Sequence, residues 1–365
     1  MKHNFTKRLA LLVALLVLLC SAFAGCGGDP TGSATTAATD NDQDILQATE
    51  AVDATEEASA NWLDSVYDPE AGEGKFSIYF INATKDYVTD SSVTHAGDST
   101  LLVSPDGVTM LIDFNNAANG SEIVASLQRL GIETLDYVVL SHPHADHIGS
   151  YATVMRYIEI KEVIKNAHDY SASSATYAAM MDAFEDAGVK ITEVTEGDTF
   201  KFGDSVDVEI LNPPVGYGYD DSTAAGNNGS VLMRFTYGES SYLTGGDLYA
   251  EQEKILVEKL GDKLKTDVVK INHHGYDTSS TREWVNAVSC KIAVCEANGV
   301  NSDVVEGRYR LSGATTLYTC LDGTVVVRTT GDGTYEVQVE QERYITIYGI
   351  LTDREGYQNG RFTLK

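Results

Sequence analysis

Short apolar runs alternate with amphipathic stretches through the first half of the chain beyond residue 75. Runs rich in β-branched and aromatic residues predict strands at Phe76–Ile81, Ser99–Val103, Thr109–Asp113, Leu135–Leu140 and Glu162–Lys165. Helical spacing predicts helices at Ser121–Leu130, Ser150–Tyr157 and Ser174–Ala187. Such alternation is typical of a layered architecture in which helices cover a sheet.

The pattern changes after Gly188 and then returns. Four consecutive strands are predicted at Lys190–Val194, Ser205–Leu211, Ser230–Tyr237 and Ser241–Thr244, followed by a helix at Tyr249–Leu260 and a strand at Thr266–Asn272. Later elements are expected at Arg282–Val288 and Lys291–Glu296, with a helix at Ser312–Cys320, strands at Thr324–Thr329 and Thr334–Val339, and a hairpin within Tyr344–Lys365. The two halves repeat one another coarsely, which favours two sheets packed together between helices.

Residues that can bind metal follow directly after one of the apolar strands. His142, His144, Asp146 and His147 fall within six residues, next to the strand Leu135–Leu140. Open α/β sheets bind ligands at the carboxyl ends of their strands, and imidazole and carboxylate are usual protein ligands of divalent transition metals. The stretch therefore predicts a metal site, in which the first two histidines face one ion and the Asp-His pair can turn towards a second.

Two later strands end in residues of the same kind. The first ends in two glycines and Asp247, and glycine lets the backbone approach a metal site closely while a carboxylate can bridge two cations. The second ends in His273 and His274. Each signal alone is weak, but three strands that deliver ligands at their carboxyl ends are specific together. Asp113, after another apolar strand, is expected to hydrogen-bond the ligand loop.

The N-terminal residues have the features of an export signal. Three basic residues precede the apolar core Leu9–Leu19, which is too short for a comfortable membrane span. Small residues then lead to Cys26, as in a bacterial lipobox, whose cysteine is lipidated; a plain secretory signal cut near Ala24 is the alternative. Both interpretations place the chain outside the cytoplasm, and lipidation of Cys26 would anchor it to the cell membrane.

The chain divides into four predicted parts. We expect a lipoprotein signal peptide over 1–26, an acidic disordered linker over 27–73, a folded domain over 74–340 and a C-terminal extension over 341–365. The linker contains twelve acidic residues and no basic ones, and it has no sustained hydrophobic period. It is therefore expected to act as a self-repelling spacer.

Charge and cysteine content narrow the possible partners and the redox chemistry. The net charge is −28, from 26 basic and 54 acidic residues. Long nucleic acid is therefore a disfavoured partner, because phosphate neutralisation needs clustered Lys and Arg. A small phosphodiester remains possible as a substrate. Cys290, Cys295 and Cys320 are expected to be unpaired packing residues, since the first two fall on opposite faces of one strand.

Together these motifs resemble the H-x-H-x-D-H signature of the metallo-β-lactamase superfamily. More narrowly, the chain resembles the soluble extracellular domain of ComEC-type competence proteins. The similar elements are Gly97-Asp98-Ser99 (G-D-[AS]), Leu111-Ile112-Asp113 (L-I-D), Asn227–Val231 (N-x-x-S-V), Leu243–Asp247 (L-T-G-D with one extra glycine) and His273-His274-Gly275 (H-H-G). Over about Lys75–Val339, this resemblance implies an α+β fold, a four-layer αββα sandwich, and a binuclear hydrolytic site that usually holds zinc or sometimes manganese.

The resemblance also implies roles for individual residues. Metal ligands are implied at His142 and His144 for one ion, at Asp146, His147 and His273 or His274 for the second, and at Asp247 as the bridge. His273 is favoured over His274 because it comes first off the strand. Catalytic roles fall to Asp146 and Asp247, and positions that support the ligands or face the substrate are implied at Asp98, Asp113, Asn227 and Ser230. Most members add a third histidine to the first metal, where this chain has asparagines, so a weaker first site is expected.

Three functions are compatible with these features. The first is a membrane-anchored phosphodiesterase or nuclease-like hydrolase, which acts through a metal-activated hydroxide on a small-molecule or cell-wall phosphodiester. The second is a β-lactamase-like amide or ester hydrolase, which the missing third histidine disfavours. The third is a non-catalytic metal-binding surface protein, which the intact motifs disfavour.

Overall fold

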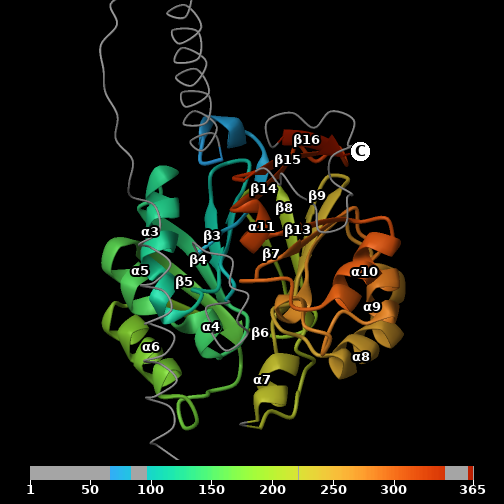
Figure 1. The fold of residues 1–365 in the computed structure, drawn as a ribbon. Helices are drawn as coiled ribbons and strands as arrows, with labels where there is room; N and C mark the ends of the chain where they lie inside the picture. Colours follow the sequence, from blue (N-terminus) through green and yellow to red (C-terminus); the bar gives the residue numbers. More distant parts are fainter. Residues whose placement is uncertain (1–65, 84–96, 221, 342–360, 365) are drawn as a thin grey trace, which may run out of the picture. The chain divides into compact units, whose positions relative to one another are not determined.

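Two β-sheets face one another at the centre of the domain. The computed structural model describes residues 66–83, 97–220, 222–341 and 361–364. Within these residues, one sheet has the strand order β16-β15-β14-β1-β2-β3-β4-β5-β6 and the other has the order β13-β12-β11-β10-β9-β8-β7. Figure 1 shows the two sheets side by side, with helices on their outer faces.

Each sheet combines an antiparallel part with a parallel part. The first sheet consists of β1 (Phe76–Phe80), β2 (Thr100–Val103), β3 (Thr109–Ile112), β4 (Thr134–Leu140), β5 (Glu159–Asn166), β6 (Lys190–Val194), β14 (Val325–Thr329), β15 (Tyr335–Val339) and β16 (Arg361–Leu364). The second consists of β7 (Thr199–Phe202), β8 (Val206–Asn212), β9 (Leu232–Tyr237), β10 (Ser240–Thr244), β11 (Val268–Lys270), β12 (Ile292–Cys295) and β13 (Thr315–Tyr318). Strands β3 to β6 and β10 to β13 are parallel, so each group has a common carboxyl edge.

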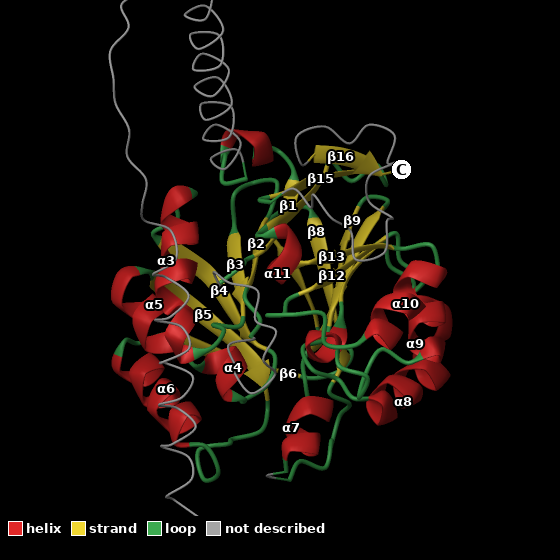
Figure 2. Cartoon of the chain, in the orientation of Figure 1, coloured by secondary structure: helices red, strands yellow, loops and turns green. Residues whose placement is uncertain are grey.

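Helices cover the outer face of each sheet (Figure 2). The first sheet is covered by α3 (Gly120–Arg129), α5 (Tyr151–Tyr157) and α6 (Ala175–Asp186), and the second by α8 (Ala250–Leu260), α9 (Arg282–Val288) and α10 (Asp303–Leu311). Shorter helical segments are α4 (Ala145–Ile148), α7 (Thr223–Asn228), α11 (Thr319–Asp322), η1 (Glu70–Gly72), η2 (Ala117–Asn119), η3 (Gly261–Leu264) and η4 (Asn272–Gly275). Among the described residues, no helix combines the length and apolarity that crossing a bilayer requires.

The period-two alternation of the strands builds the four layers. On β1, Phe76, Ile78 and Phe80 point into the core between the sheets, whereas Tyr79 joins the core beneath the helices of the first sheet. Phe80 meets Tyr242 of the opposite sheet edge-on, with ring centroids 5.8 Å apart. A third core lies between the second sheet and its helices. The predicted α+β sandwich of two sheets between helices is therefore confirmed.

The packed domain includes residues that the sequence assigned to the linker. Val66 and Tyr67 are buried. The Tyr67 hydroxyl lies 3.0 Å from Ser126 Oγ and 2.8 Å from Thr324 Oγ1, so it connects α3 with the start of β14. The packed domain therefore begins before the predicted start at residue 74. Val66 and Tyr67 gave little signal because they lie among acidic residues.

One predicted helix is wrong and several elements were missed. Residues 312–318 do not form a helix: Gly313 has a φ of 92°, which ends α10, and the β-branched and aromatic residues of Thr315–Tyr318 form β13. Of the predicted helix, Thr319 and Cys320 are helical, at the start of α11. Strand β7 and helix α7 were not predicted. Of the hairpin expected over 344–365, the structure describes β16, which pairs with β15; the rest lies outside the described residues. The three cysteines are free and buried, as predicted.

Replacement of Tyr67 tests whether the segment before β1 belongs to the domain. Tyr67→Ala removes a buried ring and two hydrogen bonds, and we expect it to lower the free energy of unfolding by about 3–5 kcal/mol. Tyr157, which is 57% exposed, provides the control, because its replacement by Ala is expected to change stability by less than about 0.5 kcal/mol. Equal denaturant midpoints for the two variants would contradict the revised boundary.

Candidate metal centre

The three predicted ligand segments meet between the carboxyl edges of the two sheets. Strand β4 of the first sheet leads into the loop and short helix that carry His142 to His147. Strands β10 and β11 are parallel neighbours in the second sheet, and they lead to Asp247 and to the η4 turn. Residues about one hundred positions apart therefore come into contact, as the carboxyl-edge argument predicts.

Four of the predicted ligands form one compact cluster. The Oδ2 atom of Asp247 lies 3.1 Å from His147 Nε2 and 3.3 Å from His274 Nε2, and the same His274 nitrogen lies 3.4 Å from Asp146 Oδ2. One ligand atom from each of these residues lies within 4.8 Å of all the others. This spacing allows all four atoms to bind the same cation.

His142 and His144 lie next to this cluster, beside Asp247 and His147. His142 Nε2 is 3.7 Å from Asp247 Oδ2, and its ring centroid is 4.6 Å from that of His144. His144 packs against α7, where a Cβ atom on Gly226 would lie 3.2 Å from His144 Nε2. Asn227, from the same helix, is buried and hydrogen-bonds His144. Asn227 therefore lies beside this histidine pair. The sequence has asparagine in place of the third histidine that most superfamily members have.

The η4 turn separates His273 from His274. Both residues have left-handed backbone conformations, with φ values of 49° and 51°. His274 points into the acidic cluster, whereas His273 lies between the rings of Tyr249 and Tyr276, at centroid distances of 4.9 and 5.3 Å. The geometry therefore favours His274 as the ligand, which reverses the sequence-based preference for His273.

Asp113 and Ser230 hold the ligand segments in place. Asp113 accepts hydrogen bonds from the Ser141 amide at 2.7 Å and from the Ser141 hydroxyl at 2.5 Å. Its Oδ2 atom is also 2.8 Å from His147 Nδ1, so an N–H at this nitrogen leaves Nε2 available for a metal. The Ser230 hydroxyl accepts from the Asp247 amide at 3.3 Å. Asp113 thus has the supporting position predicted for it.

Gly246, the extra glycine before Asp247, fits a crowded left-handed position. Its φ is 54°, and a Cβ there would lie 2.8 Å from Ser141 Oγ and 3.0 Å from Ser230 Oγ. Any other residue would have to displace one of these side chains. The insertion therefore lets the chain turn tightly enough to place Asp247 between the histidines.

Burial and charge act in opposite directions on the protonation of the cluster. Burial, reinforced by His147, holds the pKa of His142 well below its usual value. Burial also lowers the pKa of His147 and His274, but the nearby carboxylates, Asp247 above all, outweigh it and raise both well above the ordinary value. Burial opposes ionisation of Asp247, yet His274 and His147 bring its pKa well below the usual range. The carboxylates around His147 and His274 thus favour positive charge at these two positions, which a bound metal would also supply.

Several buried atoms of the cluster fit a metal better than a hydrogen-bond network. Within the described residues, His142 Nε2, His274 Nε2 and Asp247 Oδ1 have no hydrogen-bond partner, although buried polar groups normally have one. Imidazole nitrogen and carboxylate oxygen are the donors that zinc and related cations bind. The residues present therefore fit a divalent metal ion.

Some of the relevant residues were missed or lie beyond the described part. Lys270 and Glu296 are buried beside the cluster, and neither was predicted from the sequence. The signal for Lys270 was a single lysine within an apolar strand. Asp98, predicted from the resemblance alone, lies 3.1 Å from His274 Nδ1 through its Oδ1 atom. Cys26, the predicted lipidation site, lies outside the described residues.

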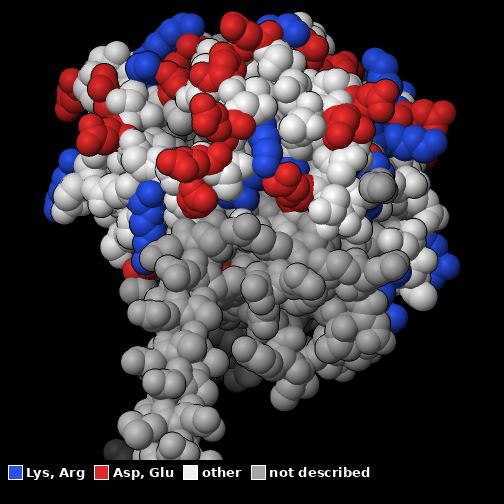
Figure 3. Space-filling model, turned by 90° about the horizontal axis from the view of Figure 1, so that it is seen from above, with Lys and Arg blue, Asp and Glu red and all other residues white. Residues whose placement is uncertain are grey.

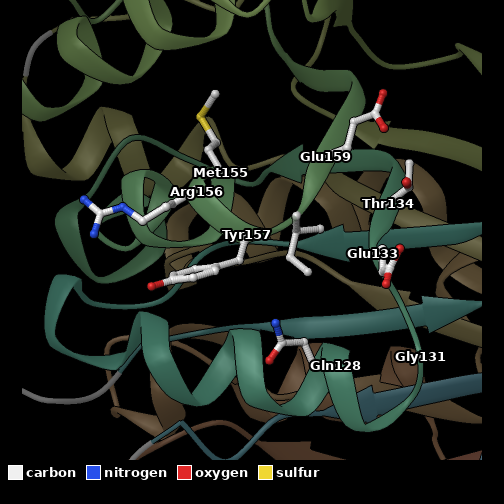
Figure 4. Close-up of a pocket in the computed structure, with 9 residues that line it drawn as sticks. Gln128, Gly131, Glu133, Thr134, Met155, Arg156, Tyr157 and Glu159 are labelled. Carbon is white, nitrogen blue, oxygen red and sulfur yellow. The ribbon is translucent and has the colours of Figure 1, made fainter.

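A separate hollow lies at the opposite edge of the first sheet (Figure 4). It has a volume of ≈ 650 Å³ and is lined by residues near the ends of α3 and α5 and the starts of β4 and β5, among them Arg156, Glu133 and Glu159. None of the predicted metal ligands lines it. Since it lies at the amino ends of the parallel strands, it is not part of the candidate metal centre.

Comparison with known proteins agrees with the fold and the motifs. Residues 94–219 match the family model of the metallo-beta-lactamase superfamily. Competence protein ComA of Neisseria gonorrhoeae is 31% identical over 212 residues, which are 57% of this chain and 27% of that protein. ComE operon protein 3 of Bacillus subtilis (strain 168) is 27% identical over 179 residues, which are 49% of this chain and 22% of that protein. The chain thus spans about a quarter of the length of these relatives.

The family match identifies residues 94–219 as part of the metallo-beta-lactamase superfamily, as the motifs predicted. Within the superfamily the chain is similar to the competence proteins. Among solved structures, zinc-bound PqqB from Methylobacterium extorquens matches with a TM-score of 0.41 and 10% identity, over 66% of this chain and 97% of that one. CmlA, a diiron beta-hydroxylase from Streptomyces venezuelae, matches with a TM-score of 0.43 and 15% identity, over 67% of this chain and 53% of that one.

Replacement of the two adjacent histidines tests which one is the ligand. We expect His274→Ala to lower the number of zinc ions that the purified chain retains, because it removes one member of the four-residue cluster. His273→Ala is the matched control and is expected to leave the metal content unchanged. Elemental analysis after dialysis measures both. Loss of metal from the His273 variant and not from the His274 variant would refute the assignment.

Proposed function

We propose that this chain is a binuclear metal-dependent phosphodiesterase. The observation that carries the proposal is the position of Asp247, whose Oδ2 atom lies 3.1, 3.3 and 3.7 Å from nitrogens of His147, His274 and His142. One carboxylate within 3.7 Å of three imidazoles suits a bridge between two cations. His142 and His144 would hold one ion, and Asp146, His147 and His274 the other.

The donor set favours zinc, with manganese as the alternative, because imidazole suits zinc and carboxylate binds both ions. When bound, two such ions supply a nucleophilic hydroxide at neutral pH and stabilise charge on the substrate oxygens. The other features needed for hydrolysis come from the arrangement of this chain's own side chains.

Asp146 is the acidic member of the cluster that solvent can reach. Its side chain is 36% exposed, whereas that of Asp247 is 3% exposed. Burial alone would raise its pKa, but His147 and His274 lower it, so its carboxylate is an acceptor at neutral pH. Asp146 can therefore accept a hydrogen bond from an attacking water and orient it towards the substrate. Asp247, in contrast, holds its neighbours in place.

A small or cell-wall phosphodiester fits the site better than a β-lactam or long nucleic acid. The absence of a third histidine, with Asn227 beside His144, departs from the three-histidine set of most superfamily members. On the described part of the face in Figure 3, acidic side chains are interspersed with Lys and Arg, and no continuous basic surface is visible there. The net charge of −28 also disfavours long nucleic acid, which needs clustered Lys and Arg. An amide or ester hydrolase and a non-catalytic metal-binding protein are the alternatives.

The substrate preference can be measured with two chromogenic substrates, a phosphodiester and a β-lactam. We expect zinc- or manganese-loaded protein to hydrolyse bis(p-nitrophenyl) phosphate and not nitrocefin. Asp247→Asn is expected to lower kcat/KM more than about 100-fold, since even residues that only support metal ligands cost 10–100-fold. Asp136→Asn, at the amino end of β4, is the matched control and should retain activity. Hydrolysis of nitrocefin alone would favour the amide hydrolase.

We also propose that the protein acts outside the cytoplasm, anchored through Cys26. The support is the basic start, the short apolar core and the small residues before this cysteine. Labelled fatty acid should be incorporated into the wild-type chain in bacteria and not into Cys26→Ser. Equal labelling of the two proteins would exclude this anchor.

A further inference from the structure

Lys270 is a buried lysine directly behind the candidate metal centre. It is the last residue of β11, a strand whose other residues are apolar, and it is 1% exposed. Its ammonium donates a 2.9 Å hydrogen bond to the carbonyl of Gly246, contacts the carboxylate of Asp98 and lies 3.6 Å from Asp247 Oδ1. The lysine therefore contacts Gly246, which directly precedes Asp247, and the carboxylates of Asp98 and Asp247.

Asp98 connects this lysine to a candidate metal ligand. Its Oδ2 atom contacts Lys270, and its Oδ1 atom lies 3.1 Å from Nδ1 of His274. The same His274 nitrogen lies 3.0 Å from the backbone carbonyl of Glu296. With Nδ1 hydrogen-bonded to this carbonyl and in ionic contact with Asp98, the ring of His274 directs Nε2 towards Asp146 and Asp247. Contacts of this kind usually fix the orientation of a metal-binding imidazole.

Burying an ammonium group is costly unless charged and polar partners surround it. Here the partners come from separate segments: Asp98 precedes β2, and Gly246 and Asp247 follow β10. An ammonium has three N–H donors, so burial alone also requires several partners. The partners of Lys270 belong to the two segments that position His274 and Asp247, and both of these residues face the same candidate ion.

We propose that Lys270 is a positioning residue for the metal ion held by Asp146, His147, Asp247 and His274. Its ammonium fixes the carboxylate of Asp98 and the carbonyl of Gly246, and through them it sets the directions of His274 Nε2 and Asp247 Oδ2. Lys270 does not touch the ion. The inference rests on the proposed metal centre, but it does not depend on any particular substrate.

Metal binding by three variants tests this role directly. In Lys270→Met the side chain keeps its length and loses its charge. In Lys270→Arg it keeps a positive charge that can reach the Asp98 carboxylate and the Gly246 carbonyl. Lys165→Met is the matched control, because Lys165 is also buried on a strand and also pairs with a carbonyl and a carboxylate, those of Asn166 and Glu193. Circular dichroism and thermal unfolding establish that each variant folds.

Titration with Co²⁺ provides the readout, because the visible spectrum of bound cobalt reports the arrangement of its ligands. We expect Lys270→Met to bind the ion of this four-residue cluster about 10–100-fold more weakly, with an altered spectrum, as for other residues that orient metal ligands. Lys270→Arg should recover most of the affinity. Lys165→Met should match the wild type in both measurements, even where it lowers stability.

The outcomes distinguish a positioning role for Lys270 from a purely stabilising one. Equal or tighter cobalt binding by folded Lys270→Met, with an unchanged spectrum, would overturn the proposal, as would equal losses in Lys270→Met and Lys165→Met. If Lys270→Met fails to fold, a Lys270→Arg spectrum identical to that of the wild type at weakened affinity would also count against it. Normal metal binding without phosphodiester hydrolysis would refute the proposed function and leave the role of Lys270 standing.

Discussion

The contact of Asp247 with three imidazoles is the constraint on which the rest of the site depends. It requires β4 of one sheet and β10 and β11 of the other to end at the same level. The inter-sheet core, with contacts such as Phe80 against Tyr242, fixes the spacing of the sheets. A slip of β4, β10 or β11 by one residue in its pairing register would reverse the faces of that strand's side chains and separate the ligands. The packing of the core and the geometry of the candidate metal centre are therefore one property of the fold.

Strained backbone is concentrated where ligand segments change direction. Asp113, His273 and His274 all have positive φ values, at 64°, 49° and 51°. For residues other than glycine such conformations cost of order 1–3 kcal/mol each and persist where surrounding contacts enforce them. At Asp113 these contacts come from Ser141 and His147. The hydrogen bonds that orient the ligands also stabilise the backbone that carries them.

The sequence predicted those parts of the site that depend on strand ends, and it failed where the local turn decides. His142, His147 and Asp247 could be placed because each follows an apolar run. The choice between His273 and His274 could not, because two left-handed residues in succession send the second imidazole inward. The same limit applies to β13, whose threonines suit a strand while the preceding pattern suggested a helix.

Charged residues inside strands explain the remaining gaps. A period-two pattern shows which residues are buried but not which partner a buried charge will meet. In the sequence, Lys270 therefore looked like a chance interruption of an apolar strand. Its role became visible when the structure placed Asp98, over one hundred and seventy residues earlier in the sequence, beside it. Asp98 in turn was predicted only through resemblance, because nothing in its own neighbourhood indicates a buried acid.

The exposure of the cluster determines the side from which a substrate can approach. His142, His147, His274 and Asp247 are buried, whereas His144 and Asp146 are partly open to solvent. Tyr249 and the ring of His273 lie on the same open side, since Tyr249 hydrogen-bonds Asn227, which also contacts His144. A phosphodiester would therefore meet one imidazole and one carboxylate first, with the lysine and the buried acids behind the reacting atoms. If the proposed function holds, recognition would fall to α7 and the start of α8, and the strand ends would organise the metal ions.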